Sequence, residues 1–292
     1  MTATAAADID ASPPRPRRPR QPVRDGQFWL ALISAGWVGL LVVLFLFRDV
    51  IAVDPSAVDA LKRLAWPLSA GHWLGTDALG RDVFARIVYG TPYSLAFGLV
   101  PTAIATVIGG GLGLLAGYGG RFANILIMRF MDIFYAFPPI LIALAIISAL
   151  GSGFLNCIVA LIIVLVPPIT RVTESATARI AGLPFIEAAE LAGADGSRIA
   201  AVQILPNVLP PVLAYVTSII GIMIIYGAGL SFLGLGVATP TPEWGLMLNE
   251  LRTAMFINPI VAALPGAFIF VTSLAFSTLG VALERRWSHV GR

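Results

Sequence analysis

The sequence is poor in the side chains on which enzymes and metal centres depend. It contains one cysteine, Cys157, which excludes an intrachain disulfide and a metal site built from several cysteines. Its one lysine, Lys62, lies outside the G-x-x-x-x-G-K-[ST] context of a phosphate-binding loop. Both histidines, His72 and His289, lie outside the apolar runs, and no nucleophile is paired with a base. We therefore predict a chain that is not an enzyme and that binds no metal or cofactor of its own.

Charged residues are also scarce, and long apolar runs take their place. Hydrophobic residues make up 58% of the chain and charged residues 12%, which is typical of a polytopic membrane protein. None of the apolar runs has a carboxylate or histidine at its centre, so the proton or sodium relay of a secondary transporter lacks its usual parts. The sequence predicts an all-α protein with six transmembrane helices of roughly 20 residues, at about 28–47, 94–117, 130–150, 154–170, 208–236 and 260–283.

The placement of arginine and lysine predicts how these helices are oriented. With the N-terminus inside, 13 of the 19 basic residues fall in inner segments and 6 in outer ones, and cytoplasmic flanks carry such an excess. Both termini and residues 183–206 are then cytoplasmic. The net charge of +3 follows from this topology rather than from nucleic-acid binding, because no basic patch has interleaved aromatic residues.

The same pattern divides the chain into segments. Residues 1–25 are rich in Ala, Pro and Arg without apolar periodicity, which predicts a disordered cytoplasmic tail. Its RPRRPR run either contacts anionic lipid headgroups or is simply solvated. The remaining segments are predicted to be a first transmembrane helix at 26–48, an extracytoplasmic loop at 49–93, a transmembrane core at 94–283 and a cytoplasmic tail at 284–292.

Residues 183–206, LPFIEAAELAGADGSRIAAVQILP, form a polar island between two apolar blocks. Pro184 suits the first turn of a helix, Gly193 breaks that helix, and Ser197 can cap a second one. The small side chains let another protein approach the backbone closely, and two glutamates can make ionic contacts at the rim. The segment is either a docking surface for a soluble partner or an ordinary amphipathic helix that packs on its own membrane domain.

Glycine and proline patterns mark two places in the core. Gly109, Gly113 and Gly117 recur at intervals of four, so a neighbouring helix can approach that face closely. Pro138 and Pro139 must interrupt the hydrogen-bond ladder of the third apolar run. A broken helix at membrane depth is tolerated where protein or a water-filled cavity surrounds it. This bend is therefore either a wall of a pathway or a kink that packs on a neighbour.

The extracytoplasmic loop contains a compact charged bend, HWLGTDALGRDVFARIVYG. Asp77 and Asp82 flank Arg81, and the glycines between them permit a tight turn. A cation site is the alternative interpretation of these carboxylates. We reject it because Arg81 itself supplies the countercharge.

Part of the 183–206 segment resembles the EAA loop of ABC importer permeases, and the matching residues are Glu187, Ala188, Ala189, Gly193, Leu205 and Pro206. Gln203 stands where that pattern has isoleucine, with Ile204 beside it. This departure resembles the dipeptide, oligopeptide and nickel group of the family. The GTD-x-x-GRD bend and LSFLGLG followed by TPTPEWGLML resemble the same group, and the resemblance covers about residues 72–283.

The resemblance implies a type I ABC importer permease fold and assigns roles to residues. The coupling helix, set into a cytoplasmic ATPase, would use Glu187, Ala188, Ala189, Glu190, Gly193, Asp195, Leu205 and Pro206. Contacts with an extracytoplasmic binding protein would involve Asp77, Arg81, Asp82, Glu243 and Trp244. The candidates for the pathway are Pro138, Pro139 and Ser231.

The implied function is to form half of the translocation pathway for di- or oligopeptides in a bacterial inner membrane. The implied partners are a homologous second permease, two ATPases that bind ATP and Mg, a solute-binding protein and membrane lipid. One alternative is a permease for nickel or another small solute. A more distant alternative is a channel or secondary transporter that works without ATP, which predicts ionisable groups within spans or an inverted repeat.

Overall fold

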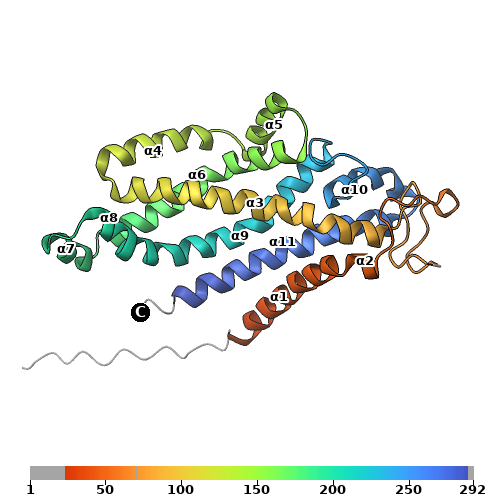
Figure 1. Cartoon of the computed structure of the whole chain (residues 1–292), viewed down its shortest axis with the longest axis horizontal. Coiled ribbons are helices and arrows are strands. Elements are labelled where there is room, and N and C mark those ends of the chain that lie inside the picture. The colour runs from red at the N-terminus through yellow and green to blue at the C-terminus, as the bar shows by residue number, and fades with distance from the viewer. Residues whose placement is uncertain (1–23, 70, 289–292) are drawn as a thin grey trace, which may run out of the picture.

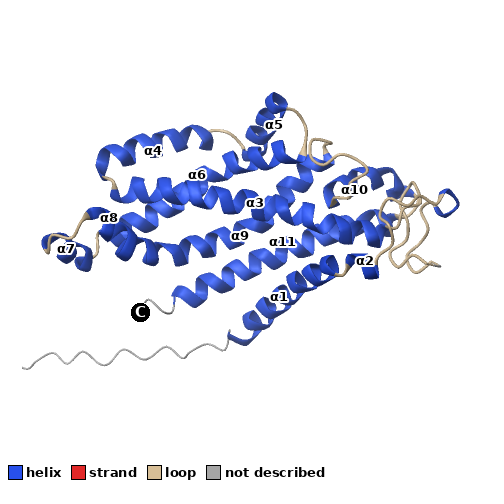
Figure 2. Cartoon of the chain, viewed as in Figure 1, coloured by secondary structure: helices blue, strands red, loops and turns tan. Residues whose placement is uncertain are grey.

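A computed structural model describes residues 24–69 and 71–288. The tail predicted at 1–25 therefore lies almost wholly outside the described residues. Within them the chain is helical and has no strand, apart from isolated bridges that join Ser69 to His72 and Thr76 to Asp82 (Figure 2). The prediction of an all-α protein is confirmed.

Eleven α-helices form the described chain: α1 (Arg24–Leu46), α2 (Arg48–Ile51), α3 (Val83–Tyr118), α4 (Gly120–Tyr135), α5 (Pro139–Leu150), α6 (Phe154–Ala181), α7 (Pro184–Leu191), α8 (Gly196–Ile199), α9 (Leu205–Phe232), α10 (Trp244–Leu251) and α11 (Pro259–Ser288). A π-helical turn, Ala200–Ile204, joins α8 to α9, and short 3-10 turns cover Ala60–Lys62 and Arg252–Phe256. The long helices run along one axis (Figure 1). One end of the bundle carries α7 and α8, here called the α7 end, and the other carries α10 and the 52–82 loop, the α10 end.

The six predicted spans are present when one of them is counted as broken. Among the described residues, five helical segments are long and apolar enough to cross a membrane: α1, α3, α6, the continuous Gly196–Phe232 segment and α11. The pair α4 and α5 passes the same test together, with a bend of 88° between them. The break lies just before Pro139, as predicted, because a proline has no N–H with which to continue the ladder of α4.

Several helices extend beyond the apolar runs that predicted them. α3 begins at Val83 rather than near 94, because Asp82 Oδ1 accepts a hydrogen bond from the Ala85 N–H at 2.7 Å and caps the helix. Its 36 residues give a length of about 54 Å, well beyond the ~30 Å hydrocarbon core. α11 likewise continues to Ser288, into the segment predicted as a tail from 284. Apolar runs mark only the part of a helix that avoids water, so they miss polar ends.

The three glycines of α3 predicted to admit a neighbour lie against α6. A Cβ atom added to Gly113 would fall 2.5 Å from Cβ of Thr173, and one added to Gly117 would fall 2.5 Å from Cβ of Thr177. At Gly109 the nearest atom, a backbone oxygen of α6, would be 2.9 Å away. These separations leave no room for a side chain, so the close approach of α3 and α6 requires glycine at each position.

Two apolar cores lie on either side of α3 and α9. The first joins α3, α5, α6 and α9, and its fully buried members include Phe97, Ile147, Leu161, Leu165 and Ile204. The second joins α1, α3, α9, α10 and α11, and its fully buried members include Leu41, Val83, Ile224, Trp244 and Val261. α3 and α9 belong to both cores, so they form the centre of the bundle.

Gly113→Leu tests the contact between α3 and α6. We expect the free energy of unfolding to fall by about 3 kcal/mol or more, because backbone atoms of α6 cannot move away as a flexible side chain can. Gly111→Leu is the matched control, since a Cβ on Gly111 meets no atom within 4 Å. Thermal unfolding of the purified chain in detergent measures both. Equal melting temperatures for the two variants would contradict the close contact.

Candidate functional site

α7 lies at the tip of the α7 end of the bundle (Figure 1). Most of its side chains are exposed. It begins at Pro184 as predicted, with proline at the position where its missing N–H has no helical partner. Ile186, only 1% exposed, anchors the helix to the bundle, whereas Phe185 and Leu191 are 47% and 83% exposed. Glu187 and Ala188 are exposed as well. The helix therefore presents apolar, small and acidic groups together on one protruding surface.

A tight turn ends α7 and leaves space beside it. Gly193 adopts φ +77°, and a Cβ built there meets no atom within 4 Å. The turn is closed by hydrogen bonds from the Gly193 N–H to the Glu190 carbonyl (2.9 Å) and from the Ala194 N–H to the Ala189 carbonyl (3.1 Å). The left-handed backbone favours glycine. The open space around it would let another protein approach the backbone.

α8 is capped by Asp195, which corrects the prediction that Ser197 is the cap. Asp195 Oδ2 accepts hydrogen bonds from the backbone N–H groups of Ser197 (3.0 Å) and Arg198 (3.4 Å), and from the Ser197 hydroxyl. That hydroxyl, followed by the two N–H groups, lowers the pKa of the Asp195 carboxyl. The capped α8 passes through the π-helical turn into α9, where Leu205 is half-buried and Pro206 exposed. α8 and α9 therefore form one continuous helical segment.

One hydrogen bond joins α7 to α3, and two more join α4 to α3 and α6 at the same end. The Tyr118 hydroxyl at the end of α3 donates to Glu190 Oε1 at 3.0 Å. The Asn124 amide of α4 donates to the Ala116 carbonyl of α3 (3.1 Å) and to Glu174 Oε1 of α6 (2.8 Å). Glu190 thus has a partner within the chain.

A cavity of about 410 Å³ lies beside the break between α4 and α5. Its lining residues come from α4, α5, α6 and α9 and the break itself: Phe134, Tyr135, Phe137, Pro139, Ile142, Val164, Leu165, Pro167, Pro168, Tyr215, Ile219, Ile222, Met223 and Tyr226. Of the predicted pathway residues, Pro139 lines this cavity and Pro138 is exposed next to it. Ser231 is fully buried and does not belong to the lining.

One arginine lies at the edge of the cavity. Arg171 of α6 donates from Nη2 to Asp132 Oδ1 of α4 at 2.5 Å, and its Cζ lies 4.5 Å from the centre of the Tyr135 ring. Arg129 is a second, longer ionic neighbour of Asp132, at 3.7 Å. Arg171 therefore links α6 to the last turn of α4, immediately before the break.

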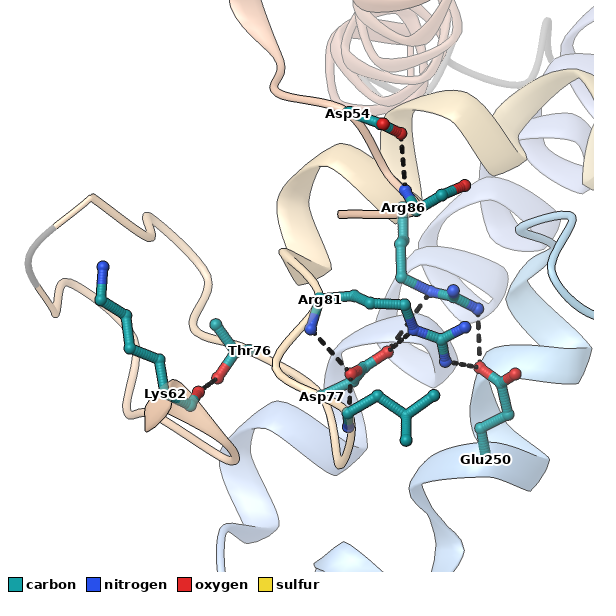
Figure 3. Close-up of polar contacts among 9 residues, drawn as sticks. Asp54, Lys62, Thr76, Asp77, Arg81, Arg86 and Glu250 are labelled. Atoms are coloured by element: carbon teal, nitrogen blue, oxygen red, sulfur yellow. Dashed lines mark hydrogen bonds and ion pairs between the residues drawn. The ribbon is translucent and has the colours of Figure 1, made fainter. Parts of the chain in front are cut away.

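A buried group of charges joins the loop at the α10 end to α3 and α10 (Figure 3). Asp77, only 2% exposed, accepts from Arg81 Nε at 2.6 Å and lies 3.7 Å from Arg86 Nε. Glu250 Oε2 accepts from Nη2 of Arg81 at 2.8 Å and of Arg86 at 2.6 Å. Arg86 is completely buried, and its Nε and Nη1 atoms have no hydrogen-bond partner within the described chain. We call these four residues the outer charge cluster.

Two further carboxylates, those of Asp82 and Glu243, cap helices at the α10 end. Asp82 caps α3 with Oδ1, and its Oδ2 lies 2.7 Å from Nδ1 of His72. Glu243 is fully buried and caps α10 by accepting from the Gly245 and Leu246 N–H groups, both at 2.9 Å. Burial raises the pKa of the Glu243 carboxyl above its ordinary value, although these hydrogen bonds oppose the shift.

Trp244 and Ser94 connect α10 to α3. The Trp244 indole N–H donates to the Ile87 carbonyl at 3.0 Å, and its backbone N–H donates to Ser94 Oγ at 3.0 Å. The Ser94 hydroxyl donates in turn to Glu243 at 3.1 Å. α10 is therefore held against α3 by hydrogen bonds from completely buried groups.

The structure brings together the residues predicted to contact a binding protein, and buries them. Exposures are 6% or less for Asp77, Arg81, Asp82, Glu243 and Trp244. These side chains support the loop from the protein interior. Their contact with a binding protein stays a prediction. Sequence reasoning missed the pairing of Arg81 and Arg86 with Glu250, and the contact between Asp82 and His72. The available signal was the position of Arg86, about one helical turn after Arg81, in the helix that Asp82 caps.

One broken span, a protruding helix–turn–helix and a cavity beside the break are together typical of a membrane transport subunit. Residues 109–289 match the family described as binding-protein-dependent transport system inner membrane component, and the chain belongs to this family. It is 41% identical over 254 residues to the glutathione transport system permease protein GsiD of Pectobacterium atrosepticum, covering 86% of this chain and 84% of that protein. The GsiD protein of Escherichia coli O157:H7 is 41% identical over 266 residues, with 88% of each chain covered.

Solved structures agree in fold. The methionine ABC transporter MetNI, in an inward-facing conformation, matches with a TM-score of 0.54 at 21% identity, over 68% of this chain and 96% of that one. An amino acid ABC transporter with histidines matches with a TM-score of 0.55 at 17% identity, over 69% of this chain and 94% of that one. The predicted ABC importer permease fold is confirmed.

Glu250→Gln tests the outer charge cluster. The amide cannot neutralise the two guanidinium groups that Glu250 joins, so we expect a loss of about 3–5 kcal/mol in the free energy of unfolding. Glu284→Gln, at an exposed position near the end of α11, is the control and should change little. Thermal unfolding in detergent compares the two. A melting temperature for Glu250→Gln equal to that of the control would show that the cluster does not stabilise the fold.

Proposed function

We propose that this chain is the membrane-spanning subunit of an ATP-driven importer for peptide-type solutes, and that it takes its motion from cytoplasmic ATPases at α7 and α8. The two GsiD proteins named above are glutathione transport permeases, and glutathione is a tripeptide. This supports a peptide-type solute for the present chain. A permease for nickel or another small solute is the alternative within the family.

The observation that carries this proposal is the exposed helix–turn–helix at the α7 end. Glu187, Ala188 and Gly193 lie together on a surface where small side chains and an open turn leave the backbone accessible. Such a surface fits a groove of a partner protein. An amphipathic helix that packs on its own bundle would instead bury more than the single side chain of Ile186.

The mechanism follows from how α7 and α8 are attached. With the α7 end in the cytoplasm, closure of two ATPases on ATP would push α7, and the continuous α8–α9 segment would carry this motion across the membrane. Tyr118 would carry it to α3, and Asn124 would link α3 and α4 to α6. The path itself would lie between this chain and a homologous second permease, since the cavity opens beside the broken span rather than inside the bundle. ATP and Mg would be bound only by the ATPases.

The α10 end would face a solute-binding protein outside the membrane. The outer charge cluster and the Glu243 cap hold this end in one shape, and a preformed surface lowers the cost of binding. An ATP-independent channel or secondary transporter would need neither the helix–turn–helix at the α7 end nor a docking surface at the α10 end. ATPase binding therefore distinguishes the proposed importer from these alternatives.

Substitutions that reverse a charge or add a bulky side chain on the exposed helix–turn–helix test ATPase coupling. We expect Glu187→Lys and Gly193→Leu each to abolish association with the ATPases while the chain still inserts in the membrane, because they reverse or obstruct the docking surface. Arg121→Glu is a control charge reversal at an exposed position of α4 at the same end. Pull-down of the ATPases from membranes provides the measurement. Wild-type recovery with both variants would reject the docking role.

Single cysteines at Pro138 and Pro139 test the pathway. Cys157→Ser supplies a cysteine-free background, and serine can keep the hydrogen bond to the Leu235 carbonyl. We expect a water-soluble thiol reagent to modify both positions in the assembled complex in at least one nucleotide state. Complete protection in every nucleotide state would remove the broken span from the pathway.

A further inference from the structure

The cavity beside the broken span is lined without any ionic side chain. Among its lining residues, polar side-chain atoms come only from the hydroxyls of Tyr135, Tyr215 and Tyr226. An unpaired charge would lose its hydration in such surroundings without compensation. The volume of about 410 Å³ lies within the range of small-molecule sites, roughly 300–1,000 Å³. The cavity therefore suits a neutral part of a ligand, such as an amide group, rather than its charged ends.

The proline pairs beside this cavity leave nearby backbone carbonyls without their helical donors. Pro167 and Pro168, which line it, have no N–H to donate to the carbonyls of Ile163 and Val164 four residues earlier. Beside the same cavity α4 ends at Tyr135, where Phe137 donates to the Phe134 carbonyl at 3.4 Å and Pro139 has no N–H to donate to the Tyr135 carbonyl. Backbone of this kind is tolerated at membrane depth when it faces a ligand or water.

The nearest cation is neutralised outside the cavity. Arg171 lies one turn after the lining prolines of α6, and Asp132 pairs with it at 2.5 Å while Tyr135 lies beneath its guanidinium. The ion pair fixes the ring that forms one edge of the cavity. The charges of Arg171 and Asp132 compensate each other. The backbone carbonyls and tyrosine oxygens therefore remain the main polar groups available to a ligand.

We propose that this cavity binds the amide groups of a short peptide in transit, with the peptide N–H groups donating to the carbonyls released by proline and to tyrosine oxygens. This inference rests on the proposed function and names the chemistry by which the solute is held. Contact through the peptide backbone is independent of side-chain identity. The aromatic and aliphatic lining adds contact area that also accepts different side chains. An acyl chain of a lipid and a side chain of the second permease are the competing occupants.

Two positions on α9 provide a matched test. Ile222 and Ile225 are similarly exposed, at 44% and 48%, but only Ile222 lines the cavity. Each is replaced by cysteine in the Cys157→Ser background, and the complete importer is reconstituted in vesicles. The rate of modification by a water-soluble thiol reagent is measured with triglycine or with trisarcosine, whose amide nitrogens are methylated. ATP-driven uptake of triglycine is measured in the same vesicles.

We expect triglycine to slow modification of Ile222→Cys about threefold at twice its dissociation constant, and trisarcosine at the same concentration to leave the rate unchanged. Neither peptide should alter Ile225→Cys. Equal protection by both peptides would overturn the role of the acceptors. Modification of Ile222→Cys by a lipid-soluble reagent alone would assign the cavity to an acyl chain, and complete protection without peptide would assign it to the second permease.

The outcomes for the cavity and for the proposed function are separable. Uptake of triglycine without protection at Ile222→Cys would overturn the cavity proposal and leave the proposed function standing. Selective protection by triglycine without ATP-driven uptake would contradict the proposed function and keep the binding site.

Discussion

The close contact between α3 and α6 determines how the two ends of this protein are related. Apolar helices gain little by leaving lipid for each other, so close packing must supply much of the attraction between them. Gly109, Gly113 and Gly117 make this packing possible because they present no side chain of α3 at these points of the contact. α3 then continues to both ends, where Tyr118 bonds to α7 and Arg86 joins the outer charge cluster. The position of the helix–turn–helix relative to α10 is thus set largely by one helix.

If the cavity is the proposed solute path, its distribution of charge would favour passage of a solute rather than retention. The ionic groups of the bundle lie at its two ends and at the edge of the cavity, while the cavity itself is lined by apolar side chains and tyrosines. A transport path needs contacts favourable enough for a solute to enter and weak enough for it to leave. Backbone carbonyls and hydroxyls meet this need better than a charged side chain would. The proline pairs therefore contribute chemistry as well as bends.

The α10 end uses charge differently. Asp77, Arg81 and Arg86 are buried together with Glu250 half-buried beside them, and the cost of removing ions from water is offset only when each has close partners. Such a cluster contributes less to net stability than to specifying one arrangement, because a displaced loop would leave an ion unpaired. Glu243 acts alongside it by capping α10 from within the core. Together they hold an irregular loop in a defined shape.

The sequence alone determined the features that depend on neighbouring residues. Apolar runs predicted the spans, Pro138 and Pro139 predicted the break, and the glycine spacing predicted a close helix contact, because each of these is a local property of a helix. Burial and pairing between distant residues were decided only by the tertiary structure. Arg81 and Glu250 are 169 positions apart, and no local pattern indicates that α10 packs on the start of α3. For the same reason charged residues that looked suited to a protein surface lie inside it, since the packing of α3, α10 and the loop removes them from water.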